Sequence, residues 1–266
     1  MIIEHLLSEV SWETRNLGLT SFELSEDGLL GIRDPTPTIL ADAGVRLGHD
    51  FFVQLRVDAR NFASVRMAED LGFRLVETSI QTELLFSRAS VVNQYCADPN
   101  RFYPSDISRM DLEARSQVAV DLQEDQKRQI IGVATRIFRT GRFHADPGCS
   151  NMLADQRMAI WITADLFPRP EVMCDTLYCR GEVVGFILRK GDRFILGGLA
   201  PQFIGRGLSK FLYLESMKNV SDAGAESISA KISAANIEVL NLYSRLGFSF
   251  LDPCYVYHFW YRYSKI

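Results

Sequence analysis

The stretch "PQFIGRGLSK", residues 201–210, places Gly205 and Gly207 two positions apart, with Gln202 three residues before the first. It lies between the apolar segment "RFILGGLA" (193–200) and a helical pattern that follows. Glycine-rich turns between a strand and a helix hold phosphates, because backbone N–H groups face outward and the helix start is positive. Dinucleotides, nucleoside triphosphates and coenzyme A all bind turns of this kind.

The spacing excludes two of these ligands. A dinucleotide fingerprint needs a third glycine where the chain has Lys210, and a P-loop needs Gly-Lys-Ser/Thr, which is absent. What remains is a strand, an open turn and a helix start directed at one spot. This arrangement suits a pyrophosphate.

A strand–helix–strand pattern occurs twice, at 51–59, 61–73 and 74–86, and again at 226–234, 236–248 and 255–263. When the two copies are aligned on Gly72 and Gly247, the following phenylalanines and the asparagines at the helix starts coincide. Ala68 takes the place of Tyr243. We therefore predict two related units, of which only the second kept a ligand site. The alternative is that both helices share a common glycine ending.

Composition points to a globular protein with small-molecule partners. The chain has 266 residues, 47% of them hydrophobic, a net charge of −4 and a pI near 5.7, so neither nucleic acid nor a membrane surface is expected as a partner. No apolar run is long enough to span a membrane and the N-terminus does not read as a secretion signal, so we expect a cytoplasmic protein. The five cysteines form no CxxC pair and fit no zinc site, which predicts free thiols and no metal.

The order Gln202-x-x-Gly205-x-Gly207, helix, strand, Asn236…Tyr243…Leu-Gly-Phe resembles the acetyl-CoA signature of the GCN5-related N-acyltransferases, the GNAT family. The resemblance implies an α/β (α+β) fold with a mixed, mostly antiparallel sheet flanked by helices. It also implies that the turn holds the pyrophosphate of acyl-CoA, that the preceding strand pairs with pantetheine and that the tyrosine lies beside the sulfur. The residues implied for acyl-CoA binding are Leu199, Ala200, Gln202, Phe203, Ile204, Gly205, Arg206, Gly207, Leu208, Ser209 and Asn236.

Segment 91–106 contains two prolines and breaks both periodicities, which predicts a domain boundary near residue 100. Residues 1–100 would then form a smaller, degenerate GNAT-like α/β domain, and residues 101–266 the catalytic GNAT domain.

Tyr243 is the predicted catalytic acid. It lies two helical turns after Asn236, so both side chains project from one face of the helix. A phenol keeps its proton at neutral pH and could donate it to the departing thiolate. The alternative is that Tyr243 only packs under the turn. No base is evident on the preceding strand, so we expect the ammonium proton to leave through ordered water or through a group from another segment. Glu182, His144 and Asp146 are weak candidates for that group.

The segment 138–167 corresponds to the part of GNAT enzymes that borders the acceptor. With "WETRNLG" (12–18), "RFHADP" (142–147) and "APQFIGRG" (200–207), the chain resembles nucleotide-sugar N-acyltransferases of the type that acts on dTDP-fucosamine. We expect Arg142, His144 and Asp146 to bind sugar hydroxyls and pyrophosphate, and Trp12 to stack on a base. The alternatives are a salt-linked surface loop and a buried, anchoring indole.

The predicted enzyme therefore moves an acyl group from acetyl-CoA or a short-chain acyl-CoA to the amine of a dTDP-linked amino-dideoxy sugar, as in polysaccharide (O-antigen) biosynthesis. The amine attacks the thioester directly in a ternary complex. Two alternatives stay open: a GNAT acting on a peptide, a protein or another small amine, and a coenzyme-A-binding sensor. The acyl chain, the position of the amine and assembly as a homodimer are also left open.

Overall fold

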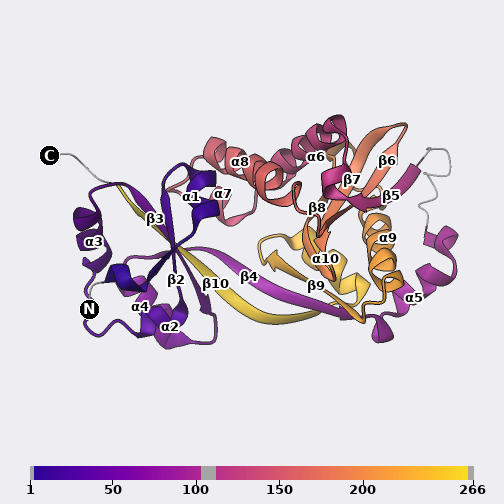
Figure 1. Ribbon diagram of the computed structural model, residues 1–266. Helices are drawn as coiled ribbons and strands as arrows, with labels where there is room; N and C mark the ends of the chain where they lie inside the picture. The colour runs from indigo at the N-terminus through magenta and orange to yellow at the C-terminus, as the bar shows by residue number, and fades with distance from the viewer. Residues whose placement is uncertain (1–2, 103–111, 263–266) are drawn as a thin grey trace.

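The computed structural model describes residues 3–102 and 112–262, and the strands in these ranges form one ten-stranded sheet (Figure 1). The strand order is β1-β2-β3-β10-β4-β9-β8-β7-β6-β5. The strands are β1 (Leu7–Glu9), β2 (Thr20–Leu24), β3 (Phe51–Asp58), β4 (Arg74–Leu85), β5 (Leu112–Val118), β6 (Val172–Cys179), β7 (Glu182–Lys190), β8 (Arg193–Leu199), β9 (Ser227–Ser233) and β10 (Ser249–Tyr261). The helices are α1 (Ser11–Leu17), α2 (Glu26–Leu30), α3 (Ile39–Leu47), α4 (Phe62–Asp70), α5 (Ser90–Ala97), α6 (Glu124–Ile137), α7 (Arg142–Ala145), α8 (Asn151–Ile160), α9 (Leu208–Asp222) and α10 (Ile237–Leu246).

The repeat predicted from the sequence is built into the centre of the sheet. β3–α4–β4 and β9–α10–β10 are its two copies, and their last strands are exchanged: β10 pairs with β3, and β4 pairs with β9. Figure 1 shows β4 and β10 running side by side between the two halves of the molecule. Ser79 faces Cys254, its equivalent 175 positions further on, so a pseudo-twofold axis passes between them.

Matching caps fix both helices of the repeat. Asn61 and Asn236 each accept a hydrogen bond from the backbone N–H three residues on, at 3.3 Å. Gly72 and Gly247 follow with φ of 83° and 93°, a conformation that favours glycine. The alignment of the two copies therefore reflects equivalent local geometry.

Helices cover both faces of strands β6–β8. Side chains along β7 alternate: Phe186 and Leu188 pack with α6, and Ile187 packs with α9. A Cβ at Gly198 would lie 2.0 Å from Ile137, so this glycine lets α6 approach β8 closely. The predicted mixed, mostly antiparallel sheet flanked by helices is confirmed.

Three segments contain helical structure that the sequence analysis above did not predict. The loop at 139–148 contains the short helix α7, the segment at 91–106 begins within helix α5, and α8 continues as a π-helical turn, Trp161–Leu166. The domain boundary near residue 100 stays a prediction, and residues 103–111 lie outside the described ranges.

Candidate active site

The glycine turn has the predicted shape. A 3₁₀ turn, Pro201–Phe203, follows β8, and α9 begins at Leu208. Gly205 and Gly207 have φ of 83° and 76°, in the left-handed region that favours glycine. No atom lies within 4 Å of a Cβ placed on Gly205, so that side of the turn is open for a ligand. The first N–H groups of the fifteen-residue helix α9 begin beside it.

The residues predicted to bind acyl-CoA include both buried and exposed side chains. Leu199, Ala200 and Leu208 are buried and offer only backbone groups, whereas Ile204 is 60% exposed. Gln202 and Arg206 are also exposed. A ligand over the turn would therefore meet backbone groups and a few exposed side chains.

Strand β8, which leads into this turn, separates from β9 and leaves a cleft. β8 and β9 run parallel but pair only at Arg193–Ser229 and Phe194–Ala230. Beyond these pairs lies a cavity of about 170 Å³, here called the β8–β9 cleft. Its lining includes Phe138, Ile187, Gly197, Tyr213, Asn236 and Tyr243. The backbone of β8 beyond Phe194 is thus left without β9 as a partner.

Tyr243 lines this cleft in a nearly closed environment. Its side chain is 2% exposed, its ring stacks on Phe248 at 4.3 Å, and its hydroxyl shares a hydrogen bond with Tyr213. Burial, followed by the neighbouring Tyr213, raises the pKa of Tyr243 well above its usual value. Tyr243 therefore carries a proton at neutral pH. The structure brings Tyr243 and Asn236 to one cleft, as their spacing predicts.

A second, larger cavity of about 500 Å³ lies where α1, α7 and α8 meet the sheet. We call it the aromatic cavity because Trp12, Phe52, Phe143 and Trp161 line it. The guanidinium of Arg157 lies 4.2 Å from the ring centroid of Phe143, and 5.6 and 5.9 Å from those of Trp12 and Trp161. Trp12 itself is 38% exposed and so retains surface for a ligand.

Arg142 interacts with several of the other charged side chains in this cavity. Its guanidinium lies 3.4 Å from Glu13, which also holds Arg157 at 2.5 and 2.8 Å. Burial, followed by the like charges of Arg157 and Arg56, lowers the pKa of Arg142 to about 9. An anionic ligand would relieve this repulsion. Nε of Arg142 and Oε1 of Gln54, both from lining residues, are buried without a hydrogen-bond partner in the described residues.

His144 and Asp146 occupy different places. His144 lines the aromatic cavity, where its Nε2 lies 2.9 Å from Asp155. Asp146 is buried beneath it and accepts hydrogen bonds from His258 and Trp260, each at 2.6 Å. Its other oxygen accepts from the Gly148 backbone at 2.8 Å. The structure thus brings Trp12, Arg142 and His144 together, and Asp146 supports them from below.

A linking cavity of about 400 Å³ joins the two sites. It shares Arg56, Arg142, Trp161 and Arg193 with the aromatic cavity, and Phe194, Ile195, Lys231, Ile232 and Ser233 with the β8–β9 cleft. Glu77, from β4, lines all three. Sequence reasoning missed Arg56, Glu77, Arg157, Trp161 and Arg193.

The remaining candidates lie apart from these cavities. Glu182 is exposed at the β6–β7 hairpin and lines none of the three cavities.

Burial raises the pKa of Cys149 to about 11 and that of Cys174 to about 12, so these thiols stay protonated. The five cysteines are free, as predicted. Among the described residues, no group of three or more His, Cys, Asp or Glu side chains could hold a metal ion.

This fold, with its opened pair of parallel strands, is that of the GCN5-related N-acetyltransferases. A member from Sphaerobacter thermophilus gives a TM-score of 0.55 at 17% identity, covering 84% of this chain and 64% of that protein, so the present chain spans less than two thirds of its length. One from Kribbella flavida gives 0.54 at 10% identity over 90% and 81% of the two chains. A tandem GNAT protein from the clavulanic acid biosynthesis pathway gives 0.50 at 10% identity over 84% and 68%. The resemblance stated from the sequence is confirmed at the level of the fold.

Among curated proteins, the chain is 25% identical over 224 residues to the spore coat polysaccharide biosynthesis protein SpsD of Bacillus subtilis strain 168. The match covers 81% of this chain and 72% of SpsD. No model of a known protein family matches the chain. None of the helices in the described ranges is both long and apolar enough to cross a membrane.

Proposed function

We propose that this chain is an N-acyltransferase that moves an acyl group from acyl-CoA to the amine of a nucleotide-linked amino sugar. One observation carries the proposal: the cleft that contains Tyr243 opens, through the linking cavity, into a larger cavity with aromatic and cationic walls. A thioester in the cleft and an amine on a ligand in the larger cavity would meet at this junction.

The donor half of the proposal rests on the turn and the cleft. The glycine turn at Gly205 and Gly207 would hold the pyrophosphate on backbone N–H groups, and the free part of β8 would pair with pantetheine. Asn236 and Tyr243 would then lie beside the thioester.

The acceptor half rests on charge and shape. The aromatic and linking cavities together are lined by six Lys or Arg side chains and three Glu side chains, which favours a ligand with negative charge. A nucleoside diphosphate fits this excess, and Trp12 or Trp161 would stack on its base. SpsD, the curated relative, is a polysaccharide biosynthesis protein, which agrees with a sugar acceptor. We name a dTDP-linked amino-dideoxy sugar as the substrate to test first.

The chemistry needs no covalent enzyme intermediate. The unprotonated amine attacks the thioester carbonyl, the C–N bond forms, and the C–S bond breaks as the thiolate leaves. Tyr243 gives its proton to that sulfur, since its buried hydroxyl is held protonated. The cysteines whose pKa is raised by burial are poorly suited to act as nucleophiles.

Binding and turnover test the proposal separately. Calorimetry with acetyl-CoA should give one site per chain, because the first unit lacks both the glycine turn and the tyrosine. Thermal unfolding should then shift upward with a dTDP-amino sugar, since a ligand at 100 times its Kd adds about 2.7 kcal/mol of stability. Transfer should release free thiol only when both substrates are present. Two acetyl-CoA sites per chain, or ping-pong kinetics, would contradict it.

The two alternative functions predict other outcomes. A peptide or protein N-acyltransferase would bind acyl-CoA but show no change in unfolding temperature with dTDP-sugars. The charged residues that line the aromatic cavity argue against this function. A coenzyme A sensor would bind the ligand and release no thiol with any amine. Division into domains 1–100 and 101–266, a cytoplasmic location and a homodimer remain part of the proposal.

A further inference from the structure

The pseudo-twofold axis assigns each side chain near the cleft an equivalent in the first unit. Leu55 pairs with Tyr257 on one side of the axis, and the equivalent residues Ala230 and Thr82 pair on the other. Both strands of the central pair also carry a bulge, at 251–253 on β10 and close to Glu77 on β4. At the 175-residue offset, Glu77 is the equivalent of Asp252.

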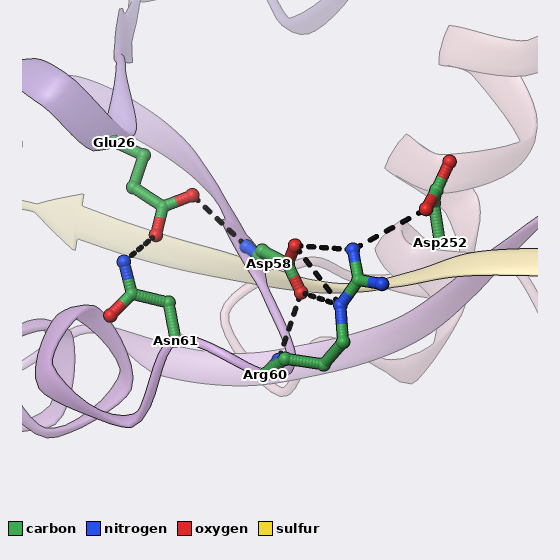
Figure 2. Close-up of polar contacts among 5 residues, drawn as sticks. All are labelled: Glu26, Asp58, Arg60, Asn61 and Asp252. Atoms are coloured by element: carbon green, nitrogen blue, oxygen red, sulfur yellow. Dashed lines mark hydrogen bonds and ion pairs between the residues drawn. The ribbon is translucent and has the colours of Figure 1, made fainter.

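The carboxylate of Asp252, on β10, belongs to an exposed ion-pair cluster with Arg60 and Asp58 of the first unit. Figure 2 shows the Arg60 guanidinium between two acids: it donates to Asp58 at 2.7 Å and to Asp252 at 3.3 Å. Hydrogen bonds from Arg60 lower the pKa of Asp58 to about 2. Asp58 and Asp252 therefore share the same cation.

In the second unit the cation is missing. The equivalents of Asp58, Arg60 and Asn61 are Ser233, Ala235 and Asn236. Within the described residues, no hydrogen bond or ion pair joins the Glu77 carboxylate to another side chain. Ser233 and Asn236, which flank Ala235, line the cleft that contains Tyr243.

Glu77 also has the position that an acceptor amine requires. It is the residue shared by the β8–β9 cleft, the linking cavity and the aromatic cavity. Charged and titratable groups surround it on several elements: Arg56 from β3, Arg142 from α7, Arg193 from β8, Lys231 from β9 and Tyr243 from α10. These cations would bind the anionic part of a substrate, which leaves the carboxylate for the ammonium group.

We infer that Glu77, supplied by the first unit through the exchanged strand β4, accepts the proton of the acceptor ammonium. The inference rests on the proposed function. The carboxylate removes H⁺ from R–NH₃⁺, directly or through one water, and the resulting amine attacks the thioester carbon. The C–N bond forms and the C–S bond breaks. The sulfur takes the Tyr243 proton, the new amide returns its surplus proton to the Tyr243 oxygen, and Glu77 releases H⁺ to solvent.

The test compares Glu77→Gln with Asp252→Asn, the same change at the equivalent position. Acetyl transfer to a dTDP-amino sugar is measured from pH 6 to pH 9.5, together with calorimetric Kd values for acetyl-CoA and for the sugar. Glu77→Gln should lower kcat about a hundredfold near neutrality, and the loss should shrink as pH rises because the amine deprotonates without help. Both Kd values should stay within about threefold of the wild type. Glu77→Asp should recover part of the activity, and Asp252→Asn should match the wild type.

Three results would overturn the inference. Equal activity of Glu77→Gln and wild type would remove Glu77 alone and leave the proposed function standing. An equal loss at every pH, with weaker sugar binding, would make Glu77 a binding residue. Absence of transfer by the wild-type protein with every dTDP-amino sugar would overturn the proposed function and this step together.

Discussion

The two strand–helix–strand units share a backbone plan, yet they differ at the place where a ligand would enter. β2 and β3 pair along five residues, whereas β8 and β9 pair at only two and then separate. The helix that follows β2 starts with Glu26, whose carboxylate accepts from the Asp58 N–H and the Asn61 side chain (Figure 2). The helix that follows β8 starts at an open glycine turn. The first unit therefore has neither the separated strands nor the open glycine turn on which the proposed anion site of the second unit depends.

Among the changes that test this comparison, replacing Tyr243, whose counterpart in the first unit is Ala68, should have the largest effect on activity. Tyr243→Phe keeps the ring that stacks on Phe248 and removes the proton. We expect kcat to fall by roughly ten- to a few thousandfold, with Michaelis constants little changed. Tyr213→Phe is the control, because it removes only the hydrogen-bond partner. A Tyr243→Phe enzyme with wild-type kcat would show that the tyrosine only packs.

A side chain that fills the open side of the glycine turn should strongly weaken acetyl-CoA binding. Gly205→Val places a branched side chain where the turn is open and forces it into an unfavourable φ of 83°. Calorimetry should show acetyl-CoA affinity reduced by at least about a hundredfold, the loss of several backbone hydrogen bonds. Gly181→Val in the β6–β7 hairpin is a matched control, since its φ is 84° and its surroundings are equally empty. Unchanged affinity in Gly205→Val would refute the turn as the pyrophosphate site.

Local patterns in the sequence carried much of this information. The glycine spacing and the Asn236–Tyr243 interval predicted the turn and one wall of the cleft, because both depend on residues close together in the chain. The repeat was visible for the same reason, since Gly72 and Gly247 end helices in the same way. Whether parallel strands pair or separate depends on tertiary packing, so the opening between β8 and β9 could not be predicted from local patterns.

The strand exchange could not be predicted from sequence patterns. Units that are 175 positions apart could each have formed their own sheet, and nothing in β4 or β10 indicates which partner it takes. Glu77 was therefore overlooked, because its place in the first unit put it far from the glycine turn in the sequence. Asp146 was misleading for a related reason: its neighbours Arg142 and His144 line the cavity, but its own partners come from the last strand.

The strands β4 and β10 also differ at His258, whose equivalent on β4 is Glu83. His258 is buried against Asp146, and burial, only partly opposed by that hydrogen bond, lowers its pKa to about 4. The unfolded chain, with a histidine pKa near 6.5, then binds the proton more readily, so stability falls as pH drops from about 6.5 to about 4. Urea unfolding should show that the wild type loses roughly 2 kcal/mol more than His258→Gln between pH 7 and pH 4.5. Equal losses would show that His258 takes up no extra proton on unfolding.

The smallest effect should come from giving the second unit the cation of the first. Ala235→Arg places a guanidinium at the equivalent of Arg60, where it should pair with Glu77 as Arg60 pairs with Asp252. Because position 235 is exposed, this ion pair should be weak, and the substrate ammonium would displace it at a cost of roughly two- to fivefold in kcat. Ala235→Met is the control that adds a long side chain without a charge. Salt at 0.5 M should restore much of the kcat that Ala235→Arg loses, and should leave the kcat of Ala235→Met unchanged. If both variants lose the same activity at every salt concentration, the difference between the two units at this position is one of space, and the unpaired carboxylate of Glu77 does not explain it.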